Sequence, residues 1–149
     1  DGFDAGFKNA ALEDTELGYR LGKKGLQIRY LPSALAYHWH PVKLDAFLER
    51  SRKQGKAAVY LVTRWPELRQ QFIDPGTWFG DRHPAIIWLL SHAIRWRPLA
   101  TLLHSLASRI ADRPPGLLQR WASPVYWLLV YHYQLLGIGS ATASEHSEA

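Results

Sequence analysis

Residues 12–21 read LEDTELGYRL, and this stretch decides how the first part of the chain folds. Two leucines four residues apart give it one apolar helical face. Glu16 and Arg20 have the spacing of a salt bridge along that helix. Two lysines follow where the helix dipole is negative, and Gly25 suits the position after the C-cap. The sequence therefore predicts a helix over 13–24.

The residues around this helix predict a loop before it and a strand after it. Residues 1–11 are rich in glycine and carry no helical or strand period. Residues 26–31, LQIRYL, alternate between apolar and polar side chains, which predicts a strand that Pro32 ends. An extended segment then leads into the sequence His-Trp-His-Pro at 38–41.

The chain after Pro41 predicts helices. Apolar side chains at three- and four-residue steps favour an amphipathic helix over 43–72, which Gly55 and Pro66 are expected to loosen or kink. Further helices are expected over 84–96, 99–113 and 117–136, and a disordered tail over 140–149. No stretch has 18 uninterrupted apolar residues, which argues against a simple transmembrane helix.

Composition narrows the class of protein. The 149 residues suffice for one domain with a moderate core. The chain has no Cys, which excludes disulfides and thiolate chemistry. It starts at Asp1 with no Met, and we expect it to be a piece of a longer protein. The net charge of +5 comes entirely from residues after Pro41, which favours an anionic partner surface.

The adjacent carboxylates of Glu13 and Asp14 are the first candidate site. Acidic side chains are common at helix N-termini because the dipole stabilises them, so a purely structural role is one interpretation. The functional interpretation is a general base, since a carboxylate held by backbone donors stays ionised and can accept a proton from an attacking hydroxyl.

His38 and His40 are the second candidate site. In an extended segment, residues two apart project to the same side, and two imidazoles can bind a divalent ion if further ligands are present. The alternative is a packed or hydrogen-bonded histidine pair. The basic side chains at 50, 52, 53 and 56 are either a solvated helix face or a contact for anionic lipid headgroups or nucleotide phosphates. They lack the interleaved aromatic residues of a nucleic-acid platform.

Taken together, four pieces of the sequence resemble one enzyme family. They are F-D-x-x-F from Phe3, L-E-D-x-E-L-G-Y-R-L from Leu12, G-L-x-I-R-Y-L-P-S-A from Gly25, and Y-H-W-H from Tyr37. Their order and spacing resemble the C-terminal part of the catalytic domain of family 2 glycosyltransferases. The resemblance covers 1–41 and implies an α/β fragment of the nucleotide-sugar-binding GT-A fold, followed by a mainly helical extension over 42–139.

The resemblance also implies residue roles. Asp14 would be the general base of an inverting transfer, with Glu13 shaping the acceptor pocket. Phe3 and Asp4 would line the acceptor side. His38 or His40 would help hold a divalent metal, Mg²⁺ or Mn²⁺, on the donor diphosphate, with His38 the first choice.

The chain contains no D-x-D motif, so most of the metal and donor site would lie in a missing half, and this piece alone should be inactive. We expect a metal-dependent glycosyltransferase that uses a nucleotide-sugar donor and a glycan or lipid-linked acceptor. The expected location is cytoplasmic, at the inner face of the cell membrane if the helices contact anionic lipid. The alternatives are a non-enzymatic helical membrane-surface or interaction module, and a small hydrolase that uses a metal bound by His38, His40 and Asp14.

Overall fold

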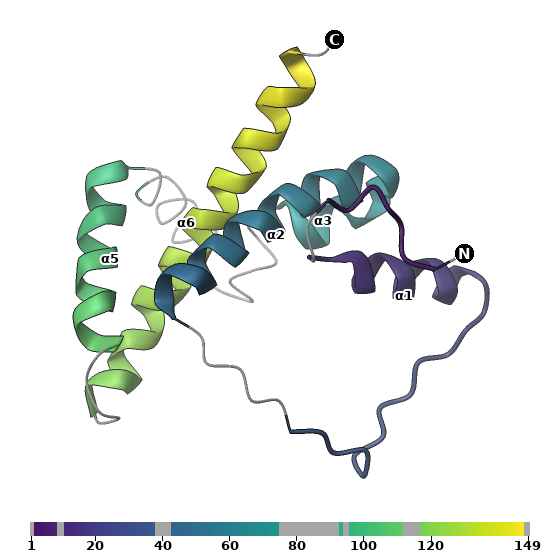
Figure 1. Cartoon of the computed structure of the whole chain (residues 1–149), viewed down its shortest axis with the longest axis horizontal. Coiled ribbons are helices and arrows are strands. Elements are labelled where there is room, and N and C mark those ends of the chain that lie inside the picture. The colour runs from purple at the N-terminus through teal and green to yellow at the C-terminus, as the bar shows by residue number, and fades with distance from the viewer. Residues whose placement is uncertain are drawn as a thin grey trace.

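A computed structural model describes residues 2–8, 11–37, 43–74, 93, 96–111 and 117–147. Within these ranges the regular secondary structure is entirely helical (Figure 1). The elements are α1 (Glu13–Lys23), α2 (Leu44–Arg64), the 3₁₀ helix η1 (Pro66–Leu68), α3 (Arg69–Phe72), α5 (Arg97–Ala111) and α6 (Leu117–Ser147).

The expected α/β class is wrong for the described part of the chain, which has no strand. The segment predicted as a strand, 26–31, has no regular structure, and Ile28 and Tyr30 are 77% and 89% exposed. Figure 1 shows the connection from α1 arching away from the helices. The physical reason is that a strand needs a neighbouring strand for its backbone N–H and C=O groups, and no described segment supplies one.

Helix α1 confirms the prediction made from LEDTELGYRL. Gly25 has a φ of 89°, and its N–H donates to the Gly22 carbonyl at 2.9 Å while the Leu26 N–H donates to the Leu21 carbonyl at 3.1 Å. These two bonds form a Schellman motif that satisfies the last carbonyls of the helix. The required left-handed conformation explains why a glycine stands at this position.

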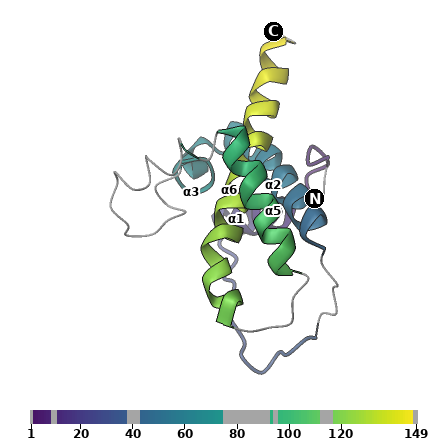
Figure 2. The same cartoon turned by 90° about the vertical axis from the view of Figure 1, so that its left-hand side faces the viewer.

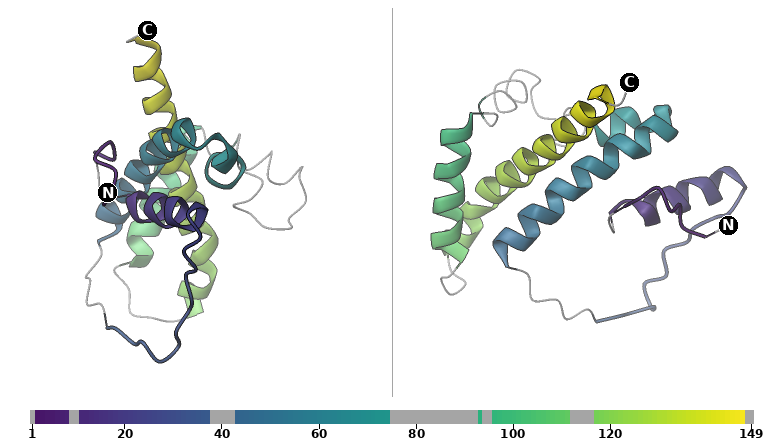
Figure 3. Two further views of the ribbon diagram at one scale, coloured as in Figure 1. Left: turned by 90° about the vertical axis from the view of Figure 1, so that its right-hand side faces the viewer. Right: turned by 45° about the horizontal axis from the view of Figure 1, so that its top comes forward.

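Helices α2 and α6 run side by side in the same direction (Figure 3). Their backbones meet at two glycines. A Cβ on Gly55 would lie 2.1 Å from the Gln134 carbonyl oxygen, and one on Gly137 would lie 2.0 Å from the Arg52 carbonyl oxygen. Only residues without a side chain permit this approach. The glycine at 55, which was expected to loosen the helix, is instead a contact point within it.

The apolar core joins three helices. Leu48 of α2, Ala107 of α5 and Leu129 of α6 form its buried centre. Helix α5 packs against α6 (Figures 1 and 2), and the Tyr126 hydroxyl donates to the Ala107 carbonyl at 3.3 Å. Partly buried side chains surround this centre: Leu44, Leu103, Val125, Tyr126, Val130 and Tyr133.

The predicted helix over 43–72 is divided at Trp65. This residue has φ −130° and ψ 79°, because the ring of the following Pro66 disfavours helical backbone before it and removes a helical N–H. Helix α6 is longer than predicted and includes 140–147, which composition assigned to a disordered tail. The helix predicted over 84–96 lies almost wholly outside the described residues.

Among the described residues, no helix is both long enough and apolar enough to cross a membrane. The longest, α6, combines its apolar side chains with buried polar residues such as His132 and Gln134.

Substitution of Gly137 by Ala should lower the free energy of unfolding by about 1–3 kcal/mol, the usual cost of overpacking. The added methyl group would meet backbone of α2, which cannot rotate away. Urea unfolding followed by far-UV circular dichroism measures the change. Gly139→Ala is the matched control on the same helix, since a Cβ there meets open space, and it should stabilise by up to about 1 kcal/mol. Equal effects of the two substitutions would contradict the close approach.

Candidate functional site

A shallow hollow of about 430 Å³ lies beside Asp14. It is formed where α1, the segment after it and the η1–α3 region come together. Its lining residues are Asp14, Thr15, Gly18, Tyr19, Ile28, Leu68, Gln71 and Phe72. One carboxylate among apolar and neutral polar side chains gives this hollow a single ionisable acid.

The carboxylate of Asp14 is exposed and is oriented by its neighbour. Its Oδ1 accepts hydrogen bonds from the Thr15 N–H at 2.7 Å and from the Thr15 hydroxyl at 3.4 Å. Glu13 precedes it, and the buried Oε2 of Glu13 has no hydrogen-bond partner among the described residues. The two side chains are therefore adjacent, but one faces solvent and the other has an unsatisfied acceptor.

The backbone immediately before this pair is strained. Leu12 has φ 65° and ψ 2°, a left-handed conformation that costs a residue with a side chain about 1 kcal/mol or more. It is the only non-glycine residue with positive φ in the described part of the chain. Strained backbone of this kind is found preferentially where a functional group must be aimed.

Helix α1 is anchored by a buried acid, Glu16, in its first turn. Glu16 is fully buried, and its carboxylate lies 3.1 Å from the Arg20 Nε. Trp65 Nε1, at the end of α2, donates to the same carboxylate at 3.3 Å. Arg20 also donates to the Gly2 carbonyl at 2.7 Å. The predicted pairing of Glu16 with Arg20 is thus confirmed, and it joins α1, the N-terminal loop and α2.

A second group of side chains joins α1 to η1. The Glu67 carboxylate accepts from the Tyr19 hydroxyl at 2.5 Å and lies 2.8 Å from the Lys23 ammonium. That ammonium also lies 4.6 Å from the centre of the Trp65 ring. Hydrogen bonds from Lys23 and Tyr19 lower the pKa of Glu67 to about 2. The Tyr19 ring that lines the hollow is therefore fixed by this group.

Phe3 and Asp4, which the resemblance places on the acceptor side, are not among the described residues that line this hollow. Phe3 is 64% exposed. Asp4 lies 3.3 Å from Arg64 Nε and accepts from the Tyr60 hydroxyl at 3.2 Å, so it fastens the N-terminal loop to α2. The Gly6 N–H, aided by Tyr60 and Arg64, lowers the pKa of Asp4 below its ordinary value.

The metal site predicted at His38 and His40 lies outside the described residues. Among the residues that are described, no three His, Cys, Asp or Glu side chains are grouped as metal ligands. Glu13 and Asp14 supply two carboxylates without a third ligand, so the described site does not fit a divalent ion by itself.

The sequence does not identify several residues that line the hollow. Thr15 and Tyr19 lie on the same helix as Asp14, but nothing in their spacing distinguishes them as site residues. Gln71 and Phe72 come after Pro66, where α2 has ended and the 3₁₀ helix η1 begins. Only the tertiary fold brings them beside α1. Glu16 was recognised as one half of a salt bridge, but its complete burial was not predicted.

Comparison with known proteins adds no relative: no family model matches the chain, and no curated protein or solved structure is found to be similar to it.

Substitution of Glu16 by Gln should lower the free energy of unfolding by about 3 kcal/mol, because the largely buried Arg20 would lose its counter-charge. Chemical denaturation measures the loss. Glu49→Gln is the matched control, since Glu49 and Arg52 form a partly exposed pair within one helix, and such a pair is worth about 1 kcal/mol or less. Similar losses for both variants would rule out Glu16 as the anchor of α1.

The depressed pKa of Glu67 predicts a specific acid sensitivity. The stability that this carboxylate contributes is complete above its unfolded pKa of 4.5 and is lost as the pH falls toward about 2. Thermal unfolding from pH 7 to pH 2 should therefore show a larger decrease in Tm for the wild type than for Glu67→Gln. The side chain is half-exposed, so solvent screening limits the size of the difference. Parallel curves would show that Glu67 has an ordinary pKa.

Proposed function

We propose that this chain supplies the acceptor-side base of an inverting glycosyl transfer. Asp14 accepts the proton of an acceptor hydroxyl as that oxygen attacks the anomeric carbon of a nucleotide-sugar. The new glycosidic bond forms as the bond to the nucleoside diphosphate breaks. The observation that supports this role best is the exposed Asp14 carboxylate at the hollow on α1, held by Thr15 directly after the strained Leu12.

The neighbouring side chains support the same assignment. An exposed carboxylate that accepts one backbone N–H has oxygen lone pairs left for an incoming hydroxyl. Tyr19 and Phe72 line the same hollow as Asp14 and bring aromatic rings to it, the kind of side chain on which sugars stack.

In this proposal, residues outside this chain bind the nucleotide-sugar donor. The chain has no D-x-D motif, and the described carboxylates form no metal-binding group. The nucleotide-sugar, and any Mg²⁺ or Mn²⁺ on its diphosphate, would therefore be held by a second, donor-binding part of the enzyme. The acceptor, which binds beside Asp14, is a glycan or a lipid-linked sugar.

Asp14→Asn tests the proposal in the polypeptide expressed from the complete open reading frame that contains this chain. Transfer from a panel of nucleotide-sugars should fall by about 10²–10⁴-fold in kcat, the usual contribution of a general base. Donor affinity, measured by calorimetry with the nucleoside diphosphate, should stay unchanged, because the amide preserves shape but cannot take the proton.

Asp45→Asn is the control, since Asp45 is an exposed acid on α2 that is not among the residues lining the hollow. It should retain transfer within about two-fold, as surface substitutions usually do. Equal turnover of Asp14→Asn and the wild type would reject Asp14 as the base. A loss of donor binding together with turnover would assign Asp14 to the donor side.

A further inference from the structure

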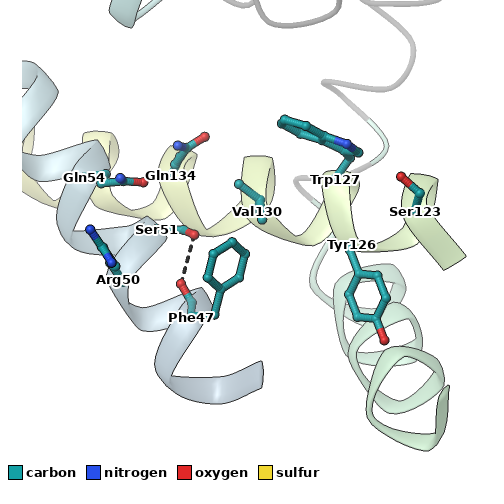
Figure 4. A pocket seen from close by; sticks show the side chains of 9 residues that line it. All are labelled: Phe47, Arg50, Ser51, Gln54, Ser123, Tyr126, Trp127, Val130 and Gln134. Carbon is teal, nitrogen blue, oxygen red and sulfur yellow. Dashed lines mark hydrogen bonds between the residues drawn. The ribbon is translucent and has the colours of Figure 1, made fainter. Parts of the chain in front are cut away.

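A larger hollow of about 640 Å³ lies between α2 and α6, in the size range of small-molecule sites (Figure 4). Its lining residues are Phe47, Arg50, Ser51 and Gln54 from α2, and Ser123, Tyr126, Trp127, Val130 and Gln134 from α6. None of them lines the hollow beside Asp14. Because the two helices run in parallel, the lining residues of α2 face those of α6.

Polar and apolar side chains are separated along this hollow. Figure 4 places Arg50, Gln54 and Gln134 toward one end of the hollow. Val130 and then Trp127 lie successively closer to the N-terminal end of α6. The Ser51 hydroxyl donates to the Phe47 carbonyl at 3.0 Å, so it is already engaged within α2. The hollow therefore has a charged, hydrogen-bonding end and a mainly apolar stretch beyond it, with Ser123 at the far end (Figure 4).

Gln134 provides an unsatisfied acceptor at the polar end. The residue is 8% exposed, and its Oε1 is buried without a hydrogen-bond partner among the described residues. A buried amide oxygen without a donor costs roughly as much as a lost hydrogen bond, so such atoms are normally paired. The backbone of Gln134 is held against Gly55, so the side chain starts from a fixed point on α6, and its amide oxygen suits a hydroxyl donor.

Arg50 provides the charge at the same end. It is exposed, and no described carboxylate forms a salt bridge with it. The neighbouring Glu49 is engaged by Arg52 at 2.7 Å. Arginine binds phosphate and carboxylate groups through its planar donors. At the other end, Phe47 and Trp127 remain 44% and 62% exposed in the folded chain, which leaves apolar area for a ligand to cover.

We propose that this hollow binds one anionic amphiphile with a hydroxyl group. Its phosphate or carboxylate contacts Arg50, its hydroxyl donates to the Gln134 Oε1, and its alkyl chain lies along Phe47, Val130 and Trp127. A monoacyl glycerophosphate has all three features. Such a molecule can reach the site free in solution or from an anionic bilayer.

Calorimetric titration of the whole chain with lauroyl lysophosphatidate, kept below its micelle concentration, tests the site. We expect saturable binding of one ligand per chain. Glycerol phosphate, which lacks the chain, and lauroyl glycerol, which lacks the charge, should each bind about ten-fold more weakly or worse, because each loses one class of contact. Non-saturating heats, or equal binding of all three compounds, would overturn the proposal.

Arg50→Gln should weaken binding by about ten-fold or more, the effect of losing a charge-assisted hydrogen bond. Lys53→Gln removes an equal charge from the same helix outside the hollow and should change affinity by less than about two-fold. Gln134→Leu should also weaken binding without lowering the Tm, because it removes an unpartnered buried oxygen. Equal losses for the two charge variants would overturn the site in favour of general charge attraction.

Flotation with phosphatidylserine vesicles distinguishes the two sources of ligand. If the amphiphile comes from a bilayer, vesicle binding should be reduced by Arg50→Gln and not by Lys53→Gln, and it should compete with lauroyl lysophosphatidate. If it comes from solution, only the monomer titration responds to the variants. Vesicle binding that both substitutions reduce equally, without monomer binding, would reject the hollow as a lipid site.

Discussion

The described structure depends on the close backbone approach of α2 and α6 at Gly55 and Gly137. Each glycine meets a carbonyl oxygen of the opposite helix at a distance that no Cβ could tolerate. This contact sets the two helices parallel and brings Leu48 against Leu129. The hollow lies further toward their N-terminal ends, where Phe47 and Trp127 are among its lining residues. The small residues therefore determine how closely the two helices pack.

The N-terminal part is attached to this helical body by polar contacts and by two ring contacts, Phe7 with Tyr60 and Tyr19 with Trp65. The buried Glu16 carboxylate and the half-exposed Glu67 carboxylate receive donors from α1 and from the end of α2. Such contacts are directional and hold a helix in one orientation. Glu16, an acid of the motif-bearing region, and Glu67 of η1 thus serve structure. Asp14 instead lines the hollow. Because the structural roles fall to other acids, Asp14 is available as the proposed base.

The two hollows draw on different elements and offer different chemistry. The one beside Asp14 combines a carboxylate with two aromatic side chains, as suits a hydroxylated acceptor. The one between α2 and α6 combines a cation and an unpaired amide with an apolar wall, as suits an anionic amphiphile. If both proposals hold, the chain places a proton acceptor and a lipid-binding groove on one helical framework.

The sequence by itself determined the local features. Spacing predicted α1 with its Glu16–Arg20 pair, the glycine that ends it, the amphipathic character of α2 and a loosening or kink at Pro66, because helix periodicity, capping and proline geometry act within a few residues. Tertiary structure decided the rest. The alternation in 26–31 produced no strand, since a sheet requires a partner that periodicity cannot reveal. Likewise, the burial of Glu16, the glycine crossing and the placement of Arg50 beside Gln134 join residues far apart in the chain. Such contacts depend on which helix faces meet, and local sequence patterns do not specify this.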